Sequence, residues 1–270
     1  MKPIARAAAL SLLIFAILAL SGFVRETTTS NLPLFWAKSA FPLPFQINQA
    51  GAKGITDGSD FTAVRQSFNT WTQVGCASVT FADKGLTDRT TTGNALQPDP
   101  TAFTPLVVFR GSQWNADGNH PSDVIALTTN IFNTDTGEIL HSDIELNNEN
   151  FTFTTFDPPS PLIQTDIRNT LTHEAGHFLG LDHSADPGAV MYARAPPGET
   201  SKRTLGDDDI RGICTIYSNG TTPGFPGIDG GGSRYVPVKG DAMGCTQGSA
   251  APMLAIFALI GIFIQARRRD

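Results

Sequence analysis

Three histidines and one glutamate within eleven consecutive residues are the part of this sequence best suited to chemistry. They form the pattern H-E-x-x-H-x-x-G-x-x-H, from His173 to His183. Residues four apart on an α-helix lie about 40° apart around it and about 6 Å apart along it, so His173 and His177 can bind one metal ion. Gly180 can end the helix, since glycine tolerates positive φ, and this turn can bring His183 back to the same ion.

Three neutral imidazoles are the ligand set of a catalytic zinc site, because they leave a fourth position open for water. Glu174 is not needed for binding the metal. Its expected role is to take the proton from the zinc-bound water as that water attacks a carbonyl group. Isolated histidines are most often structural, and a bare H-E-x-x-H arises by chance. The added Gly180 and His183 favour zinc ligation by His173, His177 and His183, with Glu174 as general base.

The residues after the third histidine resemble those of the metzincin metallopeptidases. Ser184 follows His183 directly, and the run Ala189-Val190-Met191-Tyr192 is similar to the Met-turn, in which a methionine forms an apolar floor beneath the zinc histidines. The segment 205–217 is similar to the final helix of the matrixins, the matrix-metalloproteinase-like branch. The resemblance extends, with varying strength, from about Phe35 to Tyr217.

The resemblance implies an exported zinc endopeptidase with an α+β fold. Its expected parts are a twisted mixed β-sheet, an active-site helix, a Met-turn and a C-terminal helix. It also implies that a protein or peptide substrate lies along an edge strand and adds its backbone to the sheet. The residue patterns themselves predict strands at 44–48, 78–81 and 106–109, a helix from Ser59 or Asp60 to Val74, a hairpin of 124–128 and 139–146, and the histidine-bearing helix at 166–180.

Further metal sites are less clearly indicated. Members of the family hold a second, structural zinc ion, but here His120 and His141 are the only other histidines, and Thr128 stands where another ligand is expected. We therefore expect one catalytic Zn²⁺ and no second zinc. Asp117, Asp143 and Glu145 could supply oxygen ligands to Ca²⁺. For Asp143 and Glu145 we slightly prefer another explanation, in which both carboxylates lie on a solvated polar face of a strand.

The ends of the chain predict export. Residues 1–21 combine Lys2 and Arg6 with an apolar run and small residues, as in a signal peptide. A transmembrane anchor is the alternative, but the run is short. Residues 250–270 are apolar and end in three arginines, and Cys245 precedes them. This order resembles bacterial C-terminal sorting tails, notably the type named for myxobacteria, with a plain membrane span as the alternative.

These features divide the chain into five parts. We expect a signal peptide at 1–21, a short segment at 22–34, the peptidase domain at 35–218, a Gly/Pro-rich linker at 219–249 and the tail at 250–270. The protein would be attached to the cell surface or outer membrane through this tail, or secreted. Cys76 and Cys214 lie in the exported domain and are predicted to form a disulfide, although two buried thiols are an alternative.

The net charge of −6 excludes some partners. An acidic chain without a basic patch has no surface suited to nucleic acid. We expect a monomer that acts on protein or peptide. Two other functions remain open: a non-catalytic binding module that keeps the fold, against which the retained Glu174 argues, and a zinc amidase acting on cell-wall peptides.

Overall fold

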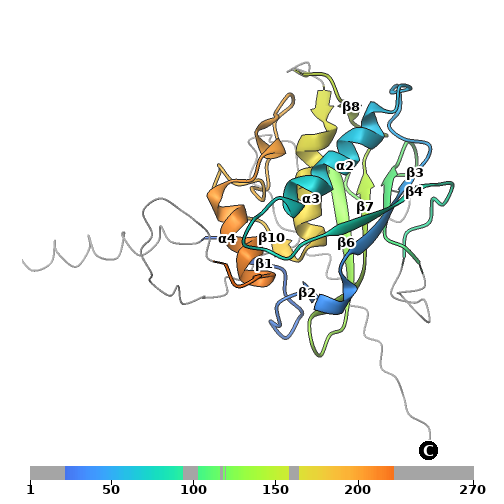
Figure 1. The fold of residues 1–270 in the computed structure, drawn as a ribbon. Helices are drawn as coiled ribbons and strands as arrows, with labels where there is room; N and C mark the ends of the chain where they lie inside the picture. Colours follow the sequence, from blue (N-terminus) through green and yellow to red (C-terminus); the bar gives the residue numbers. More distant parts are fainter. Residues whose placement is uncertain (1–21, 94–102, 116–117, 119, 158–163, 222–270) are drawn as a thin grey trace, which may run out of the picture.

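The computed structural model describes residues 22–93, 103–115, 118, 120–157 and 164–221 (Figure 1). The predicted signal peptide, most of the linker, the tail and Asp117 lie outside these residues. In the described part of the chain, no helix has both the length and the apolar character needed to cross a membrane. The elements are β1 (Val24–Arg25), β2 (Phe35–Trp36), η1 (Lys38–Ala40), β3 (Leu43–Asn48), α2 (Ser59–Thr72), β4 (Phe81–Thr87), β5 (Leu106–Phe109), β6 (Ala126–Phe132), β7 (Glu138–Leu146), β8 (Thr152–Thr154), β9 (Gln164–Asp166), α3 (Ile167–Phe178), β10 (Leu181–Asp182), η3 (Ser201–Arg203) and α4 (Asp207–Ile216).

A mixed six-stranded sheet forms the centre of the domain. Its strand order is β2-β7-β5-β3-β4, and β6 pairs with β7 as the antiparallel member. The other pairings in this sheet are parallel. Strand β5 is buried along its whole length, as expected of an apolar strand in the middle of a parallel sheet. The expected α+β fold with a twisted mixed sheet is confirmed.

The hairpin predicted from residues 124–146 is present, with different bounds for its strands. Gly137 adopts φ +79° in the turn, and β6 and β7 then pair antiparallel from Phe132↔Ile139 to Ala126↔Leu146. The first strand begins at Ala126 and continues to Phe132, past the predicted end at residue 128. This extension matters for the site, because one of the added residues, Asn130, donates to the His177 carbonyl oxygen on α3 at 2.9 Å.

The two longer helices lie together on one face of the sheet (Figure 1). α2 buries Val64, Phe68 and Trp71, which recur at helical spacing, and the Trp71 indole donates to the carbonyl oxygen of Thr172 on α3 at 2.9 Å. The Phe68 ring stacks on Phe45 of β3, with ring centroids 4.2 Å apart. The sheet and α2 thus form an apolar support behind α3.

The strand predicted at residues 78–81 is wrong in its bounds, because β4 begins at Phe81. Two residues shortly before it, Ala77 and Ser78, have partners outside the sheet. Ala77 forms an isolated bridge with Ser218, and the backbone N–H of Ser78 donates to the carbonyl oxygen of Tyr217 at 2.7 Å. These residues therefore join the end of α4 to the domain. The alternating pattern alone could not reveal this.

A contact that sequence patterns did not indicate joins the first described residues to the segment after α3. β1 pairs antiparallel with β10, through Val24↔Asp182 and Arg25↔Leu181. The backbone N–H of Phe23 donates to Asp208 Oδ1 on α4 at 2.8 Å. The segment preceding residue 35 is thus packed against the part of the chain that carries the third histidine.

Candidate metal centre

Helix α3 holds the first two histidines and begins at a well-defined cap. Asp166 is the N-cap, and its carboxylate accepts from the backbone N–H of Asn169 at 2.7 Å, as N-cap side chains commonly do. Four residues apart, His173 and His177 point from one face of the helix, as the spacing predicted. Their side chains are buried, with residue exposures of 0% and 5%.

The chain turns at Gly180 to bring back the third histidine. Gly180 has φ +87°, and a Cβ at this position would lie 2.8 Å from the carbonyl oxygen of Leu34. Both the backbone conformation and the close approach therefore require glycine. β10 follows at once, and pairing with β1 directs the chain so that His183 meets the other two imidazoles.

The three imidazoles converge on one point. His177 Nε2 lies 3.1 Å from His173 Nε2 and 3.2 Å from His183 Nε2. One ligand atom from each residue lies within 4.8 Å of the others. On the opposite side of the rings, the Nδ1 atom of His173 contacts the Val190 carbonyl oxygen at 2.7 Å, and that of His177 contacts the Leu181 carbonyl oxygen at 2.8 Å.

This arrangement fits a zinc ion. A carbonyl oxygen can only accept, so the Nδ1 atoms of His173 and His177 must carry the protons. Their Nε2 lone pairs then face one another and His183, which is unfavourable unless a cation lies between them. Three imidazole nitrogens form the ligand set of a catalytic zinc site, and the carbonyls that bind the outward N–H groups of His173 and His177 belong to its outer shell.

The electrostatics of the cluster favour a single positive charge. Burial, with the charge of neighbouring His177, holds the pKa of His173 well below its ordinary value, and burial lowers the pKa of His183 to about 2. Burial opposes charge on His177 as well, but the Glu26 and Glu174 carboxylates outweigh it and raise this pKa to about 9. The carboxylates around the cluster thus stabilise a cation at its centre.

Glu174 lies beside the histidines with one oxygen held and one open. Thr128 on β6 donates its hydroxyl to Glu174 Oε2 at 2.7 Å and lies 3.1 Å from the Glu174 carbonyl oxygen. Oε1 is buried and has no hydrogen-bond partner among the described residues. Burial raises the pKa of Glu174, although the charge on His177 and the Thr128 hydrogen bond act in the opposite direction. The side chain is thus suited to accept a proton at Oε1.

The predicted Met-turn lies against α3. Met191 is buried, and its position depends on Gly176, one residue before the second histidine. A Cβ at Gly176 would lie 2.2 Å from Met191 Sδ and 2.9 Å from the Trp71 ring. Only glycine therefore lets the methionine pack under the helix at this point. As expected from the resemblance, Met191 is a packing residue.

Comparison with known proteins agrees with this geometry. The family model of the matrixins matches residues 107–218. Human neutrophil collagenase is 53% identical over 51 residues, which cover 19% of this chain and 11% of the collagenase. Metalloendoproteinase 1 of Glycine max is 48% identical over 52 residues, covering 19% of this chain and 17% of that protein. Human matrilysin is 50% identical over 46 residues, covering 17% of each.

These matches support assignment to the metzincins and, within them, to the matrixins. The aligned segments span less than a fifth of the length of these three relatives. For the matched segment they support a matrixin-like fold, and the matrixin family implies a catalytic zinc ion. The His173, His177 and His183 cluster fits that zinc ion.

Four residues near this matrixin-like centre were not identified as site residues from the sequence. In the sequence, Thr128 was noted only as the residue that stands where a ligand of a second zinc ion is expected. Asn130, two residues further along β6, donates to the His177 carbonyl oxygen at 2.9 Å. Asp209 on α4 accepts from the backbone N–H groups of Val190 and Met191 at 2.7 and 3.1 Å. The fourth is Glu26. The predicted strand ended at Thr128, so no pattern in the sequence indicated that Asn130 lies on the same face two residues further along.

Asp143 and Glu145, the two described residues considered for Ca²⁺, use their oxygens within the protein. Asp143 accepts from the backbone N–H groups of Gly93 and Leu106, at 2.6 and 2.7 Å. Glu145 contacts Arg110 at 2.5 Å. Although burial raises the pKa of Glu145, His120 and Arg110 outweigh it and hold the pKa below its ordinary value. Both carboxylates are therefore buried and paired, which differs from the solvated strand face that we preferred.

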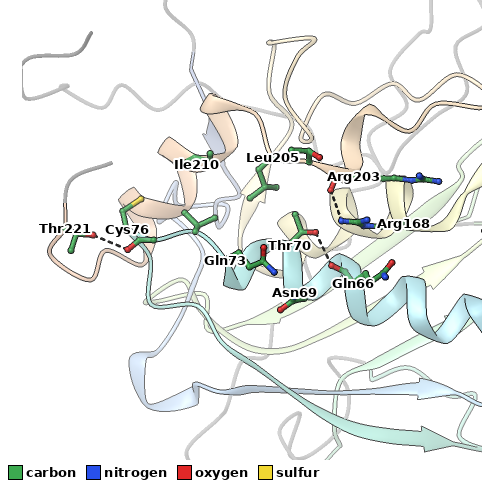
Figure 2. Close-up of a pocket in the computed structure, with 13 residues that line it drawn as sticks. Gln66, Asn69, Thr70, Gln73, Cys76, Arg168, Arg203, Leu205, Ile210 and Thr221 are labelled. Atoms are coloured by element: carbon green, nitrogen blue, oxygen red, sulfur yellow. Dashed lines mark hydrogen bonds between the residues drawn. The ribbon is translucent and has the colours of Figure 1, made fainter. Parts of the chain in front are cut away.

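One cavity among the described residues lies away from the histidines. It has a volume of about 750 Å³ and opens between α2, the start of α3 and the segment leading into α4 (Figure 2). Gln66 and Asn69 line it from α2, Gln73 lines it directly after that helix, and Arg168 lines it from α3. Arg168 is held at 3.5 Å from the carbonyl oxygen of Arg203. No member of the histidine cluster lines this cavity, so its size does not bear on the chemistry.

Proposed function

We propose that this protein is an exported zinc-dependent endopeptidase in which His173, His177 and His183 bind the metal and Glu174 is the general base. The observation that carries the proposal is the convergence of three Nε2 atoms, 3.1 and 3.2 Å apart, beside a buried carboxylate with one open oxygen. A site that served only to bind metal would not need that carboxylate.

The residues divide the work of peptide-bond hydrolysis between them. When bound, the zinc ion supplies a water of lowered pKa and polarises the substrate carbonyl. Glu174 Oε1 takes the proton of the attacking water and later delivers it to the nitrogen of the departing amine. Thr128 keeps the Glu174 carboxylate in place by binding its other oxygen.

The edge of the sheet gives the substrate a place to bind. β6 pairs with β7, and no second neighbour of β6 occurs among the described strands. Its outer edge therefore presents backbone groups to which an extended peptide can add as a further strand. Because Thr128 of β6 contacts Glu174, a peptide on this edge would pass close to the base. This placement supports a protein or peptide as the substrate.

Export rests on two independent features. The first 21 residues have the composition of a signal peptide. The disulfide between Cys76 and Cys214 is formed, as predicted, and such bonds persist mainly outside the cytosol. We infer that the protein acts outside the cytoplasm, with the apolar 250–270 segment attaching it to a membrane or serving as a processing signal.

A monomer is sufficient, since all four site residues come from one chain.

The test compares the full chain with Glu174→Gln. We expect about one zinc per chain and cleavage of a denatured protein that a chelator abolishes and zinc restores. Glu174→Gln should keep zinc and the Thr128 hydrogen bond while losing cleavage. Glu138→Gln, which removes the same charge at the start of β7, should behave as the unmodified protein.

Other outcomes would point to other functions. Zinc binding without cleavage of any protein substrate would favour the binding module, and activity confined to cell-wall peptides would favour the amidase. A chain that binds no zinc would contradict the assignment of the histidines themselves.

A further inference from the structure

Glu26 lies outside the zinc motif but is fixed beside it. It follows β1, its backbone N–H donates to the Gly180 carbonyl oxygen at 3.0 Å, and its own carbonyl oxygen accepts from Leu34 at 2.8 Å. The side chain is mostly buried, with 16% of its surface exposed. Backbone bonds on both sides therefore set the direction in which this carboxylate points.

The carboxylate bridges β6 and the second histidine. Glu26 Oε2 accepts from Asn130 Nδ2 at 2.7 Å, and the same Nδ2 donates to the His177 carbonyl oxygen at 2.9 Å. Glu26 Oε1 lies 3.2 Å from His177 Nδ1. Asn130 thus holds both the helix backbone at His177 and the carboxylate that faces its ring.

His177 consequently has a different environment from His173. The Nδ1 atom of His173 faces the neutral carbonyl oxygen of Val190, whereas the Nδ1 atom of His177 faces the Leu181 carbonyl oxygen and a carboxylate. The Nε2 atom of His177 is also the one that lies within 3.2 Å of both other histidines. The negative charge is therefore placed behind the middle ligand of the three.

We propose that Glu26 is a positioning residue for His177, and through it for the bound metal. An imidazole that ligates a cation carries part of the positive charge, and a carboxylate at its other nitrogen stabilises that charge and fixes the ring. The inference rests on the proposed zinc function. It extends the site to the segment before residue 35, which the motif does not include.

The experiment measures zinc affinity by chelator competition on the full chain, with thermal unfolding as the test of folding. Loss of an outer carboxylate typically weakens metal affinity about 10- to 100-fold, and we expect this for Glu26→Ala. Glu26→Gln is nearly isosteric but uncharged, so the zinc affinity of this variant should lie between that of the unmodified protein and that of Glu26→Ala. The matched control Glu138→Gln should bind zinc as the unmodified protein does.

A spectroscopic measurement separates positioning from a general loss of stability. With Co²⁺ in place of zinc, the visible absorption bands of both Glu26 variants should shift relative to the unmodified protein, whereas those of Glu138→Gln should not. If Glu26→Ala does not fold, Glu26→Gln carries the test alone.

Two results would overturn the inference while leaving the zinc site intact. The first is a zinc affinity of Glu26→Gln equal to that of the unmodified protein. The second is that the Co²⁺ spectra of the Glu26 variants are identical to the spectrum of the unmodified protein. A parent chain that binds neither metal would instead remove the proposed function, and this inference with it.

Discussion

The imidazole rings of His173 and His177 are oriented by contacts at Nδ1, on the side of each ring away from the cluster. The groups that make these contacts lie on segments other than the helix that carries the two histidines. Val190 of the Met-turn holds one ring and Leu181 of β10 holds the other. Glu174 is likewise held by Thr128 of β6. Each of these three side chains therefore has its rotamer fixed by a neighbour, which is the condition for a site that binds metal and substrate without first reorganising.

Thr128 offers the sharpest test at this scale. Thr128→Val keeps the side-chain shape and the strand but removes the donor to Glu174 Oε2. A hydrogen bond to a charged group contributes about 1.5–3 kcal/mol, so we expect kcat to fall roughly 10-fold or more with zinc content and KM little changed. Steady-state kinetics with metal analysis of the same preparation would measure this.

The control for that variant is Thr128→Ser, which retains the hydroxyl and should restore most of the activity. If the serine variant were as impaired as the valine variant, packing of the threonine methyl group would be the cause. A fully active Thr128→Val would show that Glu174 needs no partner on β6.

Among the elements, those with strong local patterns could be predicted and those defined by distant partners could not. The apolar spacing of α2 and the turn residues of the β6–β7 hairpin are local, and both elements are present. The short strands β1 and β10 contain two residues each, and pairing with each other is what defines them. The cluster of three histidines followed from one motif. Glu26 and Asn130, in contrast, lie 104 residues apart, and only the fold brings them together.

The Met-turn and α4 are joined through a single carboxylate. Asp209 Oδ1 accepts from the Met191 N–H, and the Val190 carbonyl of that same peptide unit binds His173. Asp209 Oδ2 accepts from Val190 and from Gly206, which precedes the helix, at 2.7 and 2.8 Å. One peptide plane thus links the position of α4 to His173, a proposed zinc ligand.

Asp209→Ala should destabilise the protein and loosen the metal. Three backbone N–H groups would lose their acceptor, at about 1–3 kcal/mol for each that stays buried, so we expect at least about 3 kcal/mol less free energy of unfolding. Zinc should also dissociate at a lower chelator concentration. Urea denaturation and chelator titration would measure the two effects.

The neighbouring Asp207 is exposed and provides the comparison. Asp207→Ala removes a charge from the first turn of α4 and should cost no more than about 1 kcal/mol, the usual scale of a helix-dipole interaction. Equal effects of the two substitutions would mean that helix electrostatics, and not the link to the Met-turn, explains the loss.

At the scale of the whole molecule, α4 contacts segments that are far apart in the sequence. Asp208 accepts from the Phe23 backbone at 2.8 Å and from the Ser184 hydroxyl at 2.6 Å, so the first described residues and the loop after the third histidine meet on this helix. The Tyr217 hydroxyl donates to the Leu179 carbonyl oxygen at 2.8 Å, at the end of α3. The metal centre is therefore completed only when both ends of the domain are in place.

The disulfide secures this closure, and its removal should lower stability more than catalysis. Cys76 and Cys214 are separated by 138 residues, so the bond restricts a large loop in the unfolded chain. We expect the double variant Cys76→Ser/Cys214→Ser to lose about 2–5 kcal/mol of unfolding free energy. Because Cys214 lies near the end of α4 and Asp209 near its start, kcat of the fraction that remains folded should be close to that of the unmodified protein.

Denaturation in the presence and absence of reductant, with kcat measured below the transition, would test both parts of this expectation. Cys245→Ser is the matched control: reductant should destabilise this variant as it does the unmodified chain and should not affect the double serine variant. A double variant of full stability would show that the backbone bonds between residues 76–78 and 217–219 are sufficient to hold α4. A stable double variant without activity would mean instead that the covalent link itself sets the position of Asp209, and with it the orientation of His173.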